Sequence, residues 1–172
     1  VLEPGADYVD VQVAFYNPLA SSRRVGLPIV LFFQQNRMDR FLPQLGFDVP
    51  VDGEHPYVAF AEAGATSYAW ELPGEAIRGF LERSNLLIFA GEAYALEGCG
   101  VTSRSLGRLH IGGPGMDGLQ AAMMRSAGES PVLISGTIRE ADGSPAVGLR
   151  LHALDSEGGY LSRAISDGEG RV

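Results

Sequence analysis

The apolar residues of this 172-residue chain occur in short segments of strand length, separated by turn-forming residues. From Val9 onward, Val9, Val11, Val13 and Phe15 alternate with more polar residues, which is the two-residue period of a half-buried strand. Similar segments follow at LPIVLFF, HPYVAFAE, TSYAWEL, NLLIFAGE and AYALEG. Twenty-three glycines and ten prolines supply turn signals between them. This pattern predicts an all-β fold.

Two windows show helical spacing instead. In PGEAIRGFLERSN, residues 73–85, Pro73 suits the first turn of a helix, and Ile77, Phe80 and Leu81 share one helical face. This window predicts one short helix. A second window, GMDGLQAAMMRSAG, is flanked by glycine and proline, which indicates a linker with a helical turn. We therefore predict two β-sandwich-like modules with one or two short helices, over residues 1–113 and 131–172, joined by a linker at 114–130.

The C-terminal module has the most specific pattern. Its segments VLISGTIRE, VGLRLHAL and YLSRAIS are joined by the turns ADGSP and DSEGG, and the turn DGEG follows them. The Asp-Gly pairs supply the positive φ angles that tight hairpins need. We expect strands at Ile134–Ile138, Val147–Ala153 and Tyr160–Ser166.

This segment resembles the carboxypeptidase regulatory-like domain, a prealbumin-like β sandwich; residues 1–113 carry no comparable resemblance. The positions that match are Gly136, Ile138, Gly143, Pro145, Gly148, Leu149, Leu151, Asp167, Gly168, Gly170 and Val172. The resemblance implies a module that is incomplete at Val172, because further strands follow this turn in the family. More chain, packing on residues 1–113, or another protein are the alternatives that would complete it.

Composition argues against several functions. All thirteen basic residues are arginines, and with twenty-one acidic residues the formal net charge is −8. This sign disfavours phosphate backbones, so we expect no nucleic-acid partner. The single cysteine, Cys99, excludes an internal disulfide and is expected to be buried. The histidines His55, His110 and His152 lack metal-ligand spacing. We therefore predict no metal, no organic cofactor, no catalytic residues and no enzymatic activity.

Three aromatic residues form the first candidate partner-binding site. Tyr68 and Trp70 lie two residues apart and therefore on one strand face, and Tyr57 belongs to a neighbouring segment. Together they would form a platform for a sugar ring or a protein partner. The alternative is that these rings pack in the core.

A basic segment forms the second candidate site. In TSRSLGRLH, regular alternation places Arg104, Arg108 and His110 on one strand face, together with Thr102 and Leu106. This predicts an exposed arginine-lined stripe that docks on an acidic partner. A merely solvated face is the alternative.

These features favour a noncatalytic interaction or scaffolding protein located in the periplasm or outside the cell, free or attached to the envelope. We expect an accessory subunit that packs on other protein subunits of a larger envelope or membrane-associated assembly. The alternative is a carbohydrate-binding accessory module of an extracellular hydrolase. The chain contains no membrane-spanning segment, and a signal peptide or lipid anchor ahead of Val1 stays an open expectation.

Overall fold

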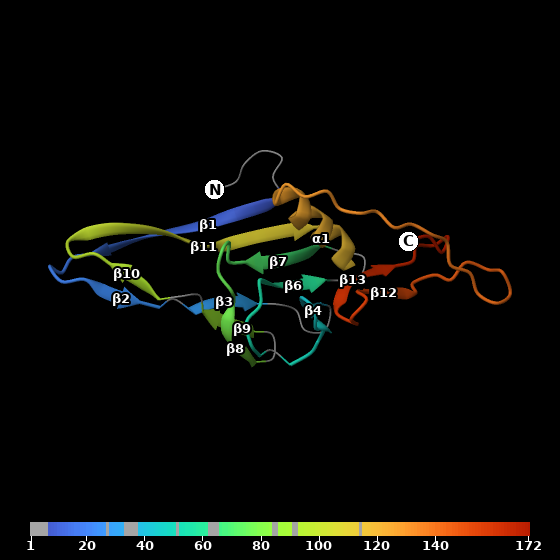
Figure 1. Cartoon of the computed structure of the whole chain (residues 1–172), viewed down its shortest axis with the longest axis horizontal. Coiled ribbons are helices and arrows are strands. Elements are labelled where there is room, and N and C mark those ends of the chain that lie inside the picture. The colour runs from blue at the N-terminus through green and yellow to red at the C-terminus, as the bar shows by residue number, and fades with distance from the viewer. Residues whose placement is uncertain are drawn as a thin grey trace.

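The computed structural model describes residues 7–26, 28–32, 38–50, 52–61, 66–83, 86–90, 93–113 and 115–172. These residues form antiparallel strands and one short helix, so the predicted all-β class is confirmed (Figure 1). Within these ranges, no helix is both long and apolar enough to cross a membrane.

The main sheet has six strands in the order β1-β11-β7-β6-β4-β5. Their bounds are Tyr8–Asn17 for β1, Asp39–Leu42 for β4, Gly46–Phe47 for β5, Tyr57–Ala61 for β6, Ser67–Glu71 for β7 and Gly100–Gly112 for β11. The strand β1 forms one edge of this sheet. The long strand β11 pairs with both β1 and β7.

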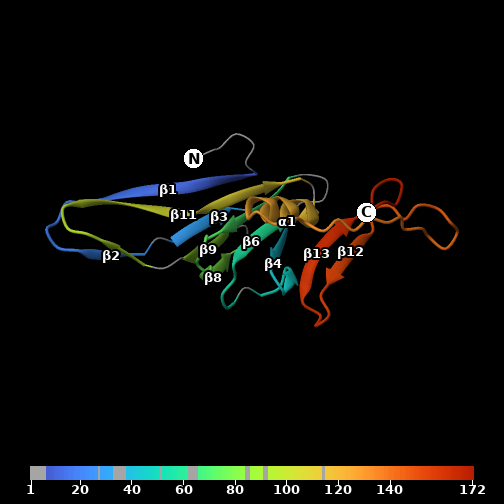
Figure 2. The ribbon, with the colours of Figure 1, turned by 45° about the horizontal axis from the view of Figure 1, so that its top comes forward.

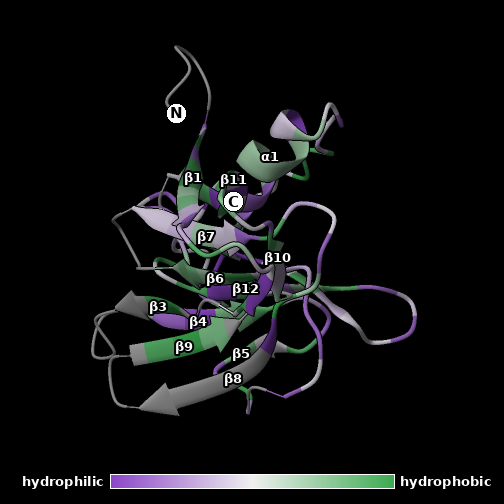
Figure 3. Cartoon of the chain, turned by 90° about the vertical axis from the view of Figure 1, so that its left-hand side faces the viewer, coloured by the Kyte–Doolittle hydropathy of each residue, from purple (hydrophilic) through white to green (hydrophobic). Residues whose placement is uncertain are grey.

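One face of the main sheet packs against a second sheet of three strands, in the order β3-β9-β8. These strands span Pro28–Phe32 (β3), Arg78–Arg83 (β8) and Leu86–Ala90 (β9). Val58, Phe60 and Trp70 of the main sheet meet Leu87 and Phe89 of β9 in a buried cluster, which we call the sandwich core. The apolar character of β9 is visible in Figure 3. The predicted sandwich-like packing of residues 1–113 is thus observed.

The helix predicted over residues 73–85 is wrong. Its second half forms β8, which pairs with β9, and Pro73 and Gly74 lie in a turn. Ile77 is fully buried in the sandwich core, where its amide and carbonyl both bond to the backbone of His55. The apolar spacing of so short a window fits a helix and a strand alike. Backbone pairing with β9 favours the strand.

The predicted linker contains a helix of 12 residues, α1 (Gly115–Ser126), which covers the second face of the main sheet. Met116 and Leu119 pack against Phe41 and against alanines of β6 and β7. Gly112 permits this close contact, since a Cβ atom there would lie 2.6 Å from the Cα of Leu119. The segment is therefore part of the packed structure.

The C-terminal end of β1 and the N-terminal end of β11 project from the body as an arm (Figure 1). The arm also contains β2 (Arg23–Val25) and β10 (Tyr94–Leu96), which pair with each other. Asn17 is buried at the tip, where its amide donates to the carbonyls of Ser21 (3.0 Å) and Glu97 (3.1 Å). These bonds tie the connecting segments of the arm together. Cys99 lies at this tip and is exposed, so its predicted burial is wrong.

The C-terminal module contains the antiparallel hairpin β12 (Arg150–Leu154) and β13 (Tyr160–Ile165). Two of the three predicted strands are thus present in shorter form. The third, Ile134–Ile138, is not a strand, although Gly136 and Ile138 bond through their backbones to Val172 and Gly170. The resemblance to the carboxypeptidase regulatory-like domain stays a prediction.

The β12–β13 hairpin packs on residues 1–113 and on α1 (Figure 2). The amide of Tyr160 donates to the carbonyl of Gln44 at 3.0 Å, and its ring contacts Phe47. The guanidinium of Arg163 lies 3.6 Å from the Phe47 ring centre and donates to Asp39 at 2.7 Å. The structure therefore shows the hairpin packed on residues 1–113, and completion of the module by more chain or by another protein stays a prediction.

Replacing Asp39 with alanine should release this hairpin. Arg163 is only 4% exposed, and without Asp39 its buried charge would lose its carboxylate partner. We expect a loss of about 3 kcal/mol in the free energy of unfolding, the lower end for a broken buried pair, because Asp39 itself is partly exposed. Hydrogen exchange should accelerate in residues 150–165 more than in β6 and β7. The control is Glu157→Ala, in an exposed turn; equal exchange in both variants would contradict the role of the ion pair.

Candidate functional site

The predicted aromatic platform does not form. Trp70 is 7% exposed, and Tyr68 packs beside it against the sandwich core. Tyr57 lies on the opposite face of the sheet, where its ring stacks on Phe41 and the Gln120 side-chain amide donates to its hydroxyl at 3.3 Å. The pairing of Val58, rather than Tyr57, with Trp70 explains this separation. The alternative prediction, that these three rings pack inside the protein, is therefore the correct one.

The strand β11 forms as predicted, but its arginines do not share one face. Its register with β1 shifts between Val11 and Gln12, which marks a β-bulge opposite these residues. Leu106 and Leu109 both pack against the sandwich core although they are three residues apart. Regular alternation would place them on opposite faces. The side-chain phase of β11 therefore changes near Gly107.

The bulge separates the three residues of the predicted stripe. Arg104 is exposed in the arm, with its guanidinium 6.0 Å from the Tyr94 ring. Arg108 and His110 lie on the other face, where both contact Tyr8. His110 is 1% exposed, so a continuous exposed stripe over these residues is wrong.

Instead, Arg108 joins a polar ladder of three side chains on adjacent strands. Asp10 of β1 and Glu71 of β7 both lie directly opposite Arg108. The Nε–H of Arg108 donates to Asp10 Oδ1 at 2.8 Å, and the guanidinium lies 4.0 Å from the centre of the Tyr8 ring. The hydrogen bond from Arg108 to Asp10 is the main cause that raises the pKa of the guanidinium. The cation is thus held between two carboxylates.

His110 lies beside the polar ladder, two residues after Arg108 on the same face of β11. Its Nε2 lies 2.7 Å from Glu71 Oε2, which is hydrogen-bond distance. Its Nδ1 is buried and has no hydrogen-bond partner among the described residues. Within the same ranges, no group of three His, Cys, Asp or Glu side chains is arranged to hold a metal ion. The His110–Glu71 pair therefore fixes the ladder in position.

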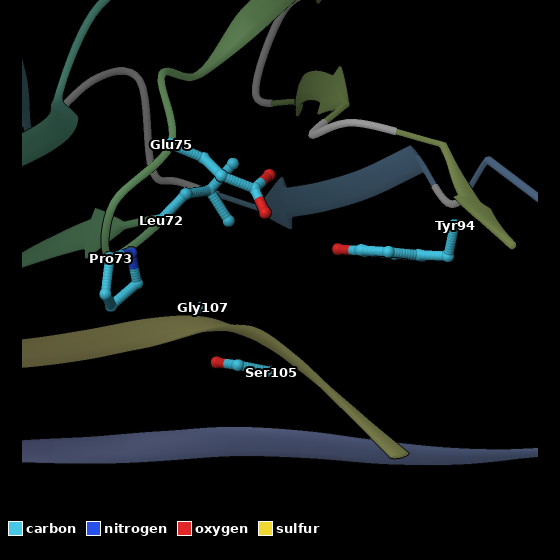
Figure 4. Close-up of a pocket in the computed structure, with 6 residues that line it drawn as sticks. All are labelled: Leu72, Pro73, Glu75, Tyr94, Ser105 and Gly107. Atoms are coloured by element: carbon cyan, nitrogen blue, oxygen red, sulfur yellow. The ribbon is translucent and has the colours of Figure 1, made fainter. Parts of the chain in front are cut away.

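A hollow open to solvent lies between the body and the arm (Figure 4). It is lined by Leu72, Pro73, Glu75, Tyr94, Ser105 and Gly107. The Tyr94 hydroxyl and the Glu75 carboxylate both point into it. Partial burial raises the pKa of Tyr94, and the charge of Glu75 adds to this effect. The hollow presents one aromatic ring and polar groups, but no enclosed cavity.

The C-terminal module exposes many of its apolar side chains. Val132, Leu133 and Ile134 are 84%, 90% and 82% exposed. Val147, Leu149, Leu154 and Leu161 are also exposed, and together with the first three we call them the C-terminal apolar set. Among the described strands, β12 pairs only with β13. Exposed apolar groups beside an unextended hairpin are typical of protein-binding surfaces.

Sequence reasoning missed the residues that join distant segments: Tyr8, Asp10, Glu71, Asp39 and Arg163. One local signal was present, since Asp10 is the only charged residue in β1. A charge in the middle of an apolar strand requires a partner, but the sequence does not say which one. That information resides in the register of β1 on β11.

Comparison of the chain with protein-family models, with curated proteins and with solved structures gives no match. The polar ladder, the hollow and the C-terminal apolar set are therefore interpreted from their geometry alone.

Replacing Gly107 with alanine should destabilise the fold. Gly107 has a φ of 140°, and a Cβ atom there would lie 2.5 Å from Trp70 Nε1 and 2.7 Å from the Glu71 carbonyl oxygen. We expect a loss of roughly 2–4 kcal/mol from crowding and backbone strain, measured by denaturant unfolding. Gly113→Ala is the matched control, since a Cβ atom there meets nothing within 4 Å. Equal losses in both variants would show that the bulge does not need glycine.

Burial of Tyr68 should make the fold sensitive to alkaline pH. Burial raises the pKa of Tyr68 from 10.0 to about 12, so the unfolded chain releases this proton first. The stabilisation is fully present below pH 10 and is lost as the pH rises through about 12. Tyr68→Phe should flatten this alkaline decline in unfolding free energy, with Tyr16→Phe as an exposed control. An unchanged slope in Tyr68→Phe would disprove the linkage.

Proposed function

We propose that this chain is a noncatalytic interaction protein, an accessory subunit that docks on a larger envelope or membrane-associated assembly outside the cytoplasm. The observation that carries the proposal is the C-terminal apolar set. Leu133 and its two neighbours are each more than 80% exposed, and contiguous exposed apolar groups mark interaction sites. A protein partner that covers them would remove this apolar surface from water.

The way in which the module is held supports a docking role. Arg163 is buried against Asp39 and Phe47, and Tyr160 bonds to Gln44. The side chain of Gln120 in α1 also donates to the carbonyl of Leu161, at 2.6 Å. The hairpin therefore has a fixed orientation on the body. A fixed orientation lowers the ordering entropy that a partner must overcome on binding.

The net charge of −8 also bears on the choice of partner. It disfavours anionic polymers and favours a neutral or basic protein surface around the apolar contact. The carbohydrate-binding alternative loses the aromatic platform on which it was based, because Tyr68 and Trp70 lie in the core.

Site-specific photo-crosslinking in the cells that naturally produce the protein tests this proposal. A photoreactive residue at Leu133 should give a discrete covalent adduct with a second, different protein. The same residue at Glu157, which is exposed in the β12–β13 turn, is the matched control and should give none.

The double variant Val132→Asp and Ile134→Asp, combined with the probe at Leu133, should abolish the adduct. Both side chains are exposed, so the melting temperature should not change. No adduct from Leu133, or the same adducts from Leu133 and Glu157, would refute a docking role for this surface. Binding to a glycan array in that case would favour the carbohydrate alternative.

A further inference from the structure

The strand β1 forms an outer edge of the main sheet (Figures 1 and 2). It spans ten residues, and within the described ranges β11 is the only strand that pairs with it. Proteins commonly protect such edges with lysine, proline or a bulge in the edge strand. The sequence YVDVQVAFYN has neither lysine nor proline, its one charge, Asp10, is paired with Arg108 of the same chain, and the bulge lies in β11. The edge is therefore suited to pairing with another strand.

The backbone phase of β1 follows from its hydrogen bonds to β11. The amide of Ile111 donates to the carbonyl of Asp7 at 3.0 Å, which makes Asp7 and Ile111 a hydrogen-bonded pair. Opposite residues in antiparallel strands alternate between bonded and non-bonded pairs. The N–H and C=O groups of Tyr8 therefore point away from β11, as do those of Gln12, Ala14 and Tyr16. Asp10 has the same phase.

The sequence of β1 is nearly symmetric about Gln12. Reading outward from Gln12, the residues on the two sides match as Val11 with Val13, Asp10 with Ala14, Val9 with Phe15, and Tyr8 with Tyr16. Three of these four pairs join side chains of the same kind. A strand with this pattern presents matching side chains to an antiparallel copy of itself.

Backbone phase is compatible with the register that side-chain symmetry selects. A two-fold axis at Gln12 puts outward-facing residues opposite outward-facing residues, which antiparallel bonding requires. It also places the single charge of the strand, Asp10, opposite Ala14 rather than opposite its own copy. Shifting the axis to Asp10 would oppose two carboxylates, which is unfavourable. Tyr16, which is 69% exposed in the single chain, would gain Tyr8 of the other copy as its neighbour.

We propose that two copies of this chain associate through β1, antiparallel and with Gln12 on the two-fold axis, to form one continuous sheet. Such an interface is isologous. If residue i of the first copy contacts residue j of the second, then residue j of the first copy contacts residue i of the second. The proposal is independent of the proposed docking role, since β1 and the C-terminal apolar set belong to different parts of the molecule.

Sedimentation equilibrium of the 172-residue chain over a micromolar concentration range tests the association. We expect a reversible shift from the 18.3 kDa monomer to a dimer. Gln12→Lys should weaken the dimer about fivefold, because two like charges would face each other at the axis. Ser103→Lys on β11 adds the same exposed charge one strand inward and should leave the dissociation constant unchanged.

Cysteine crosslinking tests the register in a Cys99→Ser background. A residue that opposes its own copy in a bonded pair has a Cα–Cα distance of about 5.5 Å, which a disulfide spans. Gln12→Cys should therefore form a crosslinked dimer on mild oxidation. Ala14→Cys should not, because its two copies would lie on the order of 14 Å apart along the strands.

A chain that stays monomeric throughout the concentration range would overturn the proposal. A dimer that Gln12→Lys does not weaken, or that crosslinks as readily through Ala14→Cys as through Gln12→Cys, would overturn it as well. At concentrations where the wild type is monomeric, the melting temperatures of Gln12→Lys and Ser103→Lys should both match the wild type, because both side chains are exposed.

Discussion

The backbone ladder between β1 and β11 is the constraint on which the rest of the structure depends. Because β11 also pairs with β7, its phase decides which residues of three strands face the sandwich core and which face α1. The bulge near Gly107 changes that phase once along its length. Trp70 occupies the space that a side chain at position 107 would need. The extra residue in β11 is the reason that Arg104 and Arg108, four positions apart, lie on opposite faces of the sheet.

The C-terminal module depends on the body in a different way, through charge and aromatic contact. Arg163 has little contact with water, and Asp39 together with the ring of Phe47 replaces its hydration. This arrangement fixes β13 firmly but leaves Leu133 and Ile134 outside the packed region. The same module is therefore rigid where it meets the body and apolar where it meets solvent. That combination is the physical basis for the docking role that we propose.

The strands could be predicted from the sequence because their signals are local. Alternation in β1 and the apolar runs of β6 and β9 each require only a few neighbouring residues. The segment around Ile77 was predicted wrongly, since its apolar spacing suits both a helix and a strand. The opposite facing of Tyr57 and Trp70 depends on inter-strand register, and the pairing of Asp39 with Arg163 joins positions 124 residues apart. Neither signal exists in a local window.

The bulge also has a consequence for the arm. A strand that lacked Leu106 would run without a bulge, and every other side chain of β11 would keep its present face. What would change is the direction of the arm, because a bulge bends its strand and increases the local twist. Chain length at this position therefore controls where the arm points, independently of which side chains the arm displays.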